Sequence, residues 1–182
     1  MTDAKKVIQI LNAGGVAILP TETLYGLVCD ATNPQALLKI YQIKNRPIGK
    51  AFPVLVKDLE MLSRYASFNP EQKKAILKAK RPTNFVLKAR NLSPLLTQKK
   101  TAVFRIAKHP VLKKIFVRFD RPVVATSANL AGKEPINDPR KYQEVFGKNS
   151  ALIDLAVFYG INRRRNPSAI VDLTKKPFRV LR

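Results

Sequence analysis

Residues 3–19, DAKKVIQILNAGGVAIL, change from a helical pattern to a strand pattern within one short stretch. Apolar residues recur between positions 7 and 11 at the spacing of one helix face, and the pair Gly14-Gly15 ends the helix that they predict. The run VAIL at 16–19 is apolar at every position, which predicts a strand buried on both faces. A helix joined by a short turn to a buried strand is a building unit of α/β proteins.

The same alternation continues along the chain. Asn33 followed by Pro34 is a strong helix start, because asparagine caps a helix and proline fits its first turn. We predict further helices at 34–41, 58–65, 70–79, 110–117 and 139–146, and strands at 52–56, 85–87, 101–106, 123–126, 151–154, 168–173 and 178–181. No internal repeat or Ser/Gly-rich linker interrupts this order. The sequence therefore predicts an α/β fold, a single domain over residues 1–182 with a twisted mixed sheet and flanking helices.

Composition excludes several classes of protein. The 182 residues are 46% apolar, which is enough to bury one sizeable core and argues against disorder. No apolar run approaches the roughly 20 residues of a membrane span, and the N-terminus lacks the long apolar region of a signal peptide. We therefore expect a cytoplasmic protein with no membrane partner. A single cysteine and a single histidine rule out an internal disulfide and a Cys/His zinc cage, and a Ser-His-Asp triad could use only His109.

Basic residues are concentrated in the middle of the chain. The sequence holds 34 Lys and Arg against 12 Asp and Glu, a formal net charge of +22, and residues 61–120 alone hold 15 basic and 2 acidic side chains. One interpretation is a solvated face that keeps the protein soluble. Because so large a charge repels itself unless polyanions compensate it, we favour RNA or DNA as a partner. The basic surface is predicted from Lys73, Lys74, Lys78, Lys80, Arg81, Lys88, Arg90, Lys99, Lys100, Lys113, Lys114 and Arg118, joined by Arg163, Arg164 and Arg165.

Neither of the common nucleotide-binding loops is present. A P-loop ending at Gly49-Lys50 would need a glycine at position 44, where the chain has Lys44, and Gly14-Gly15 does not continue as G-x-G-x-x-G. A nucleotide site in this protein must therefore rely on side chains more than on a glycine-rich cradle.

Four segments place polar, small or cationic residues where predicted strands or helices end: PTETLYGL at 20–27, KNRP at 44–47, TSANLAG at 126–132 and NPSAIVD at 166–172. In open α/β sheets such loops converge on one ligand crevice. Each segment also has a structural interpretation. Thr21, Ser127 and Ser168 suit turns or caps, and Lys44 and Arg46 suit the C-terminal end of a helix. The joint occurrence of all four favours a site.

Together these segments resemble the YrdC/TsaC family of threonylcarbamoyl-AMP synthases. The family signatures PT[DE]TxYGLxxDA, K-x-RP, AVRxPxHP, TSANxSG and PSTIVD correspond here to PTETLYGLVCDA, KNRP, AVFRIAKHP, TSANLAG and PSAIVDL. The resemblance runs in order from about residue 14 to residue 182. It implies a twisted mixed sheet around a positively charged cavity, and a reaction of L-threonine, bicarbonate and ATP that gives threonylcarbamoyl-AMP and pyrophosphate. This product serves the threonylcarbamoyladenosine modification of tRNA, which other tRNA-modification proteins would complete.

The resemblance also implies roles for ten residues. Lys44, Arg46, Ser127 and Asn129 would be catalytic, and the ATP site would comprise these four with Lys50, Thr101 and Ser168. Thr21, Thr23 and Arg105 would bind threonine, Arg105 through its carboxylate. Mg²⁺ would accompany ATP, held mainly by phosphates, because Glu22 is the only carboxylate nearby and can equally be a structural turn residue. Family members also bind RNA, so tRNA or double-stranded RNA is the expected nucleic acid.

The chain departs from the family pattern at two places. Where the family has P-G-P-[TL]-T before F-[VI]-L, residues 80–87 read KRPTNFVL, so that Arg81 replaces a glycine and adds charge near the predicted cavity. Ala107-Lys108 replaces the usual proline and acidic residue before His109. Two alternatives therefore stay open. One is a catalytically reduced RNA-binding or ribosome-maturation protein, and the other is carbamoyl-adenylate formation on a different amine.

Overall fold

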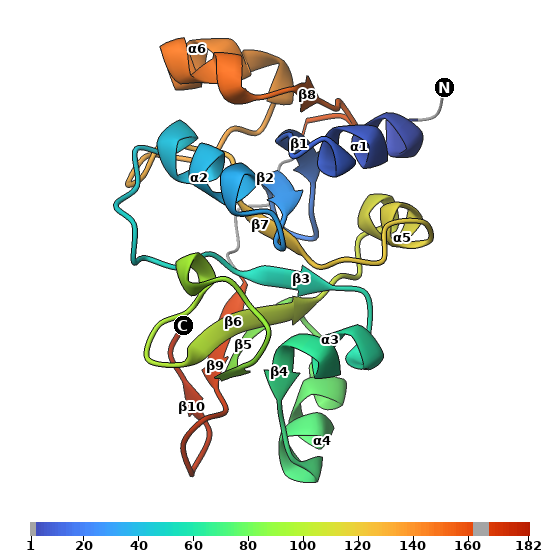
Figure 1. Cartoon of the computed structure of the whole chain (residues 1–182), viewed down its shortest axis with the longest axis vertical. Helices are drawn as coiled ribbons and strands as arrows, with labels where there is room; N and C mark the ends of the chain where they lie inside the picture. The colour runs from blue at the N-terminus through green and yellow to red at the C-terminus, as the bar shows by residue number, and fades with distance from the viewer. Residues whose placement is uncertain (1–2, 162–167) are drawn as a thin grey trace.

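A ten-stranded sheet forms the centre of the computed structural model, which describes residues 3–161 and 168–182 (Figure 1). The strand order is β10-β9-β5-β6-β3-β7-β2-β1-β8, and β4 pairs with β5 outside this path. The strands are β1 (Ala17–Pro20), β2 (Tyr25–Asp30), β3 (Val54–Val56), β4 (Ala66–Ser67), β5 (Thr83–Ala89), β6 (Thr101–Ile106), β7 (Val123–Ser127), β8 (Leu155–Ala156), β9 (Ala169–Asp172) and β10 (Arg179–Val180). Three pairs are parallel, β1 with β8, β3 with β6 and β5 with β9, and the other pairs are antiparallel. The predicted mixed sheet is confirmed.

Helices cover the sheet at both ends of the molecule. In Figure 1, α1, α2 and α6 lie around β1, β2 and β8 at the top, and α3 and α4 lie beside β4 at the bottom. The helices are α1 (Asp3–Asn12), α2 (Pro34–Ile43), α3 (Leu59–Tyr65), α4 (Pro70–Lys78), α5 (Pro110–Phe116) and α6 (Tyr142–Phe146), with 3-10 turns η1 (Pro94–Leu96), η2 (Pro139–Lys141) and η3 (Gly147–Leu152). None of the helices in the described ranges has the length and apolar character needed to cross a membrane.

Local capping explains where α2 begins and ends. The Asn33 side chain accepts hydrogen bonds from the N–H groups of Gln35 and Ala36, and Pro34 occupies the first turn, as predicted. Lys44 ends the helix, and Asn45 then adopts the left-handed conformation with φ of 47°. This reversal turns the chain so that the next residue, Arg46, leaves the helix direction.

The structure corrects three sequence-based expectations. The segment PTETLYGL at 20–27 is not one loop, because its last three residues begin β2, which pairs with β1 in a hairpin closed by residues 21–24. The strand predicted at 151–154 begins later, as β8 at Leu155, since residues 147–152 form η3 after Gly147 ends α6 with a positive φ. The helix predicted at 139–146 is divided between η2 and α6. An apolar run of three or four residues fits a short helix and a short strand equally well, so its length cannot decide between them.

A tyrosine in β2 ties the sheet to the segment before residue 162. The Tyr25 ring is 1% exposed, and its hydroxyl donates to the Gly160 carbonyl over 2.7 Å and accepts from the Tyr159 N–H over 2.9 Å. Both partners are backbone groups that would lose this bond if the hydroxyl were removed.

We expect Tyr25→Phe to lower the free energy of unfolding by about 1–3 kcal/mol, because two backbone groups lose their partner beside a buried ring. Urea denaturation followed by circular dichroism measures the change. Tyr65→Phe is the matched control, since within the described ranges Tyr65 is bonded through its backbone carbonyl, which accepts from the Arg90 N–H, and its hydroxyl makes no hydrogen bond there. Equal stability of the two variants would contradict the role given to Tyr25.

Candidate active site

Seven of the ten residues predicted to bind substrate line one cavity of about 460 Å³, which we call the polar cavity. They are Thr21, Thr23, Arg46, Arg105, Ser127, Asn129 and Ser168. They come from the β1–β2 turn, the segment after α2, β6, the end of β7 and the start of β9. Segments that are up to 147 residues apart in sequence therefore meet at one place.

The wall of the polar cavity is basic. Its charged side chains are Arg46, Arg105, Lys133 and Arg182, and no Asp or Glu from the described ranges lines it. Sequence analysis did not identify Lys133, Arg182 or Asn84 as site residues. A polar residue inside the strand run TNFVL was the one signal that could have pointed to Asn84.

Lys44 lies beneath the polar cavity instead of in its wall. Its side chain is buried, and its ammonium donates to the carbonyls of Ser127 and Asn129 over 2.6 and 2.8 Å and to the Asn129 Oδ1 over 2.8 Å. Three acceptors use all three N–H donors of an ammonium group. In this structure Lys44 thus positions the turn that carries Ser127 and Asn129, whereas sequence analysis expected it to meet a phosphate.

Side-chain hydrogen bonds also hold the turn that Lys44 positions. The Ser127 hydroxyl donates to Asn129 Oδ1 over 2.7 Å, and the Asn129 amide donates to the Lys133 carbonyl. Burial, with a smaller effect from the nearby charge of Arg46, lowers the pKa of Lys44 from 10.5 to about 7. The protonation of one buried lysine is therefore coupled to the shape of this turn.

Arg46 reaches the polar cavity from the other side. Its Nε donates to the Lys50 carbonyl over 2.9 Å, and its guanidinium carbon lies 5.0 Å from the centre of the Phe52 ring. Stacking on an aromatic ring holds the guanidinium plane while leaving N–H groups for an anion. Lys50 contributes to this site through its backbone carbonyl, which orients Arg46. The Lys50 side chain is exposed and is not part of the cavity wall.

Thr101 lies at the other end of β6 from Arg105. The two residues are four positions apart, a distance of about 13 Å along the strand, and the Thr101 hydroxyl donates to the Gln98 carbonyl over 2.8 Å. Thr101 instead lines a separate open pocket with Lys88, Lys99 and Lys100. The ATP-binding roles expected for Lys50 and Thr101 therefore gain no support from where these residues lie.

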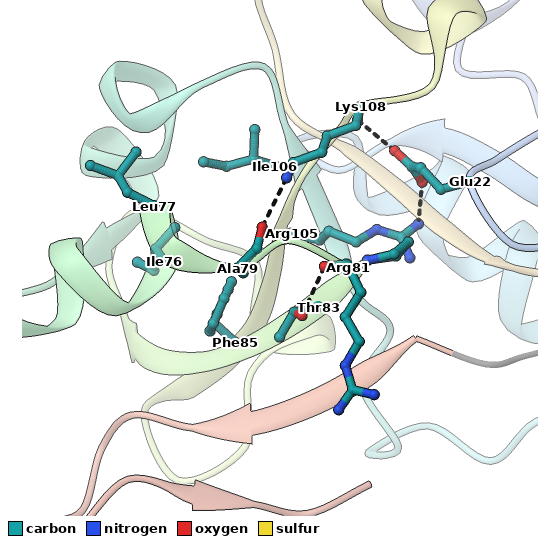
Figure 2. A pocket seen from close by; sticks show the side chains of 11 residues that line it. Glu22, Ile76, Leu77, Ala79, Arg81, Thr83, Phe85, Arg105, Ile106 and Lys108 are labelled. Carbon is teal, nitrogen blue, oxygen red and sulfur yellow. Dashed lines mark hydrogen bonds and ion pairs between the residues drawn. The ribbon is translucent and has the colours of Figure 1, made fainter.

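A buried ion pair fixes Arg105 in the wall of the polar cavity. Arg105 Nη2 lies 3.2 Å from Glu22 Oε2, with side chains only 8% and 10% exposed, and Arg105 Nη1 donates to the Ser168 hydroxyl over 2.6 Å. Glu22 Oε1 accepts from the backbone N–H of Lys108 over 2.5 Å (Figure 2). It also accepts from the backbone N–H of His109 over 2.9 Å. Glu22 therefore has a structural role, because it links the β1–β2 turn to Arg105 and to the start of α5.

Electrostatics at this pair follow from burial and proximity. Burial alone would raise the pKa of Glu22, but the charge of Arg105 and the backbone N–H donors outweigh it and lower that pKa below 4.5. Burial also lowers the pKa of Arg105, an effect that Glu22 opposes. Both groups stay ionised at neutral pH, so the pair keeps a guanidinium fixed at the cavity edge.

Departures from the family pattern lie next to this pair. Lys108 donates from its ammonium to the Ala79 carbonyl over 3.0 Å, joining the segment before α5 to the end of α4. Figure 2 shows the Arg81 side chain extending away from Glu22. Arg81 lines a neighbouring, mostly apolar pocket of about 180 Å³ and is not in the polar cavity wall. The predicted basic run Arg163–Arg165 lies outside the described residues.

The β1–β2 turn combines a structural and a site role. The Thr21 hydroxyl donates to the Leu24 carbonyl over 2.7 Å and shapes the turn, while Thr21 and Thr23 both line the polar cavity. A Cβ at Gly26 would lie 3.1 Å from the Thr126 carbonyl oxygen in β7, closer than an ordinary contact, so glycine lets the two strands approach without a shift of either backbone. The close approach of β2 and β7 brings the turn up to Ser127.

We compared the chain with known proteins. Residues 9–182 match the Sua5/YciO/YrdC family model, described as telomere recombination. The threonylcarbamoyl-AMP synthase of Photobacterium profundum is 33% identical over 94% of this chain and 95% of its own length. Among solved structures, Sua5 of P. abyssi complexed with L-threonine superposes with a TM-score of 0.87 at 26% identity, covering 98% of this chain and 53% of that longer chain. E. coli YciO gives a TM-score of 0.84 at 27% identity, covering 98% of this chain and 87% of that one.

The lowered pKa of Lys44 predicts a pH-dependent stability. Between pH 7 and pH 10.5 the unfolded chain holds the Lys44 proton more strongly than the folded chain does, so the contribution of Lys44 to the free energy of unfolding rises with pH in this window. Relative to Lys44→Met, we expect the wild type to gain up to about 1.4 kcal/mol per pH unit.

Urea denaturation of both proteins at several pH values between neutral and about 10 measures this difference. Taking the difference between the two proteins removes the effect of the many exposed lysines, which titrate in both. Parallel stability profiles would contradict the lowered pKa.

Proposed function

The chain belongs to the Sua5/YciO/YrdC family, and we propose that it forms L-threonylcarbamoyl-AMP from L-threonine, bicarbonate and ATP with release of pyrophosphate. The observation that carries this proposal is the polar cavity, where seven of ten predicted residues meet in a basic wall. The product would serve threonylcarbamoyladenosine modification of tRNA, in keeping with the names of the related synthases.

In this reaction the protein binds the substrates and stabilises charge, and no side chain acts as a nucleophile. The threonine amine attacks the carbon of bicarbonate and water leaves, which gives a carbamate. A carbamate oxygen then attacks the α-phosphorus of ATP, the bond from this phosphorus to the bridging oxygen of the β-phosphate breaks, and pyrophosphate leaves. Carbamates are labile in water, so a partly enclosed cavity protects the intermediate.

Each end of the polar cavity suits one substrate. Arg105 is buried and fixed by Glu22, which fits a guanidinium that receives the threonine carboxylate beside Thr21 and Thr23. Arg46 and Lys133 suit the ATP phosphates. The turn of Ser127 and Asn129, positioned by Lys44, would meet the nucleotide, with Ser168 between the two substrates.

Mg²⁺ would arrive with ATP. Within the described ranges, no group of three or more His, Cys, Asp or Glu side chains is placed to hold a metal ion. Glu22, the nearest carboxylate, is engaged by Arg105 and two backbone N–H groups. Phosphate oxygens are the ligands that remain for Mg²⁺ in this site.

RNA is the proposed macromolecular partner. The net charge of +22 and the exposed lysines of residues 61–120 support a polyanion, and tRNA is the substrate of the modification that the product serves. Binding would be strongly salt-dependent. Other tRNA-modification proteins would act after this one, in the cytoplasm.

An assay for the adenylate tests the proposal. Purified protein is incubated with L-threonine, bicarbonate, ATP and Mg²⁺, and the products are measured by mass spectrometry and by pyrophosphate release. We expect threonylcarbamoyl-AMP. Absence of the adenylate together with tight RNA binding would favour an RNA-binding protein, and product from another amine alone would favour a different carbamoyl-adenylate.

Arg46→Ala and Arg105→Ala should each lower turnover by about a thousandfold. A unit charge about 4 Å away stabilises the anion that it contacts, the phosphates for Arg46 and the threonine carboxylate for Arg105, by about 4 kcal/mol at an effective dielectric constant of 20, and each 1.4 kcal/mol is a factor of ten. Both variants should keep the RNA affinity of the wild type.

Arg118→Ala is the reciprocal control. Arg118 is exposed and lies outside the polar cavity, so this variant should keep full turnover and weaken salt-sensitive RNA binding. If all three variants lost both properties in parallel, the separation of a catalytic cavity from an RNA surface would be wrong.

A further inference from the structure

Asn84 is a buried polar residue with no role in the site described so far. It is 4% exposed, lines the polar cavity, and its Oδ1 has no hydrogen-bond partner within the described ranges. A buried amide normally has its hydrogen bonds satisfied, and an unsatisfied one points to a missing partner. Because a half-turn about Cβ–Cγ exchanges the amide oxygen and nitrogen, either atom can face a ligand.

Strand register places Asn84 at the Arg105 end of the polar cavity. Asn84 of β5 pairs with Ile170 of β9, and Phe85 pairs with Phe104 of β6. One position further along the antiparallel β5–β6 pair, Asn84 lies beside Arg105. The Arg105 Nε, like the Asn84 Oδ1, has no hydrogen-bond partner among the described residues. Asn84 therefore belongs to the amino-acid half of the site.

The charge around Asn84 limits what it can bind. A cationic amine is disfavoured next to the Arg105 guanidinium, and the nearest carboxylate, Glu22, is already engaged. An anionic group would be drawn to Arg105 itself. A neutral hydroxyl remains, and it both donates and accepts hydrogen bonds, as the amide does.

We propose that Asn84 is a specificity-determining residue, which recognises the side-chain hydroxyl of the amino-acid substrate while Arg105 holds its carboxylate. This inference rests on the proposed function, because it takes L-threonine as the substrate. It also accounts for one difference from the family pattern at residues 80–87. Where the pattern has a threonine, this chain has Asn84, whose side chain is longer and carries an amide.

The test compares two ligands that differ only in the hydroxyl, L-threonine and L-2-aminobutyrate. Their affinities are measured by calorimetry, and their kcat/KM values by pyrophosphate release. A site that hydrogen-bonds a hydroxyl discriminates against an analogue lacking it, so the wild type should prefer threonine by at least about tenfold. Asn84→Leu should lose roughly ten- to hundredfold in threonine affinity and leave L-2-aminobutyrate unchanged.

Two further variants control the experiment. Asn84→Thr keeps a side chain that donates and accepts hydrogen bonds, with a hydroxyl in place of the amide, and should keep part of the preference that Asn84→Leu loses. Thr83→Val alters the adjacent residue, which lines the neighbouring pocket and donates to the Arg81 carbonyl over 3.0 Å, and should keep the wild-type preference. Circular dichroism checks folding, and Asn84→Ala carries the same test if the leucine variant does not fold.

Several outcomes overturn the inference. Equal losses for both ligands would make Asn84 a packing residue, and an unchanged threonine affinity in the leucine variant would remove it from the site. A wild type that makes adenylate from both amino acids equally well overturns the role of Asn84 and leaves the proposed function standing. A wild type that makes no adenylate from threonine overturns both.

Discussion

An ion pair removed almost completely from water organises this protein around its cavity. Glu22 and Arg105 join the β1–β2 turn, β6, the start of α5 and the segment before β9, through one salt bridge, two backbone hydrogen bonds and the Ser168 hydroxyl. Taking two charges out of water is costly, and only such a dense set of partners offsets it. The result is a guanidinium that cannot leave the edge of the polar cavity, which suits a site where a carboxylate must be held in one orientation.

A second buried cation organises the other half. Lys44 holds the turn of Ser127 and Asn129 through three oxygen acceptors, while Arg46, two residues later, faces the cavity itself. Within one short motif, the lysine thus positions a turn and the arginine lines the cavity wall. The cations in the wall repel one another when the cavity holds only water, and the triphosphate of the proposed substrate would relieve that repulsion. Binding and charge neutralisation are coupled for this physical reason.

Much of this arrangement could be predicted from local signals. Asn33-Pro34 marked the start of α2, the apolar run at 16–19 marked β1, and the four polar segments marked six residues of the cavity wall. The seventh, Arg105, was expected from the family resemblance of the segment AVFRIAKHP. The failures have equally local causes. A short apolar run at 151–154 could not be distinguished from η3, and the strand β2 was hidden because its residues belong to a motif whose polar first half is a turn. Thr101 carried a side chain of the right type on the right strand, at the wrong end of it.

Residue type and order by themselves determined the class of fold, the basic character of the chain and the set of segments that make the site, because these follow from periodicity, charge and spacing. Only the tertiary structure decided which side chains face the cavity. Lys44 lies beneath the cavity, and Lys50 and Thr101 lie outside it. Asn84 and Lys133 line its wall. These positions depend on strand register and helix capping, which bring distant residues together. A residue's partners across the sheet depend on pairings between strands far apart in the chain, and no local pattern contains that information.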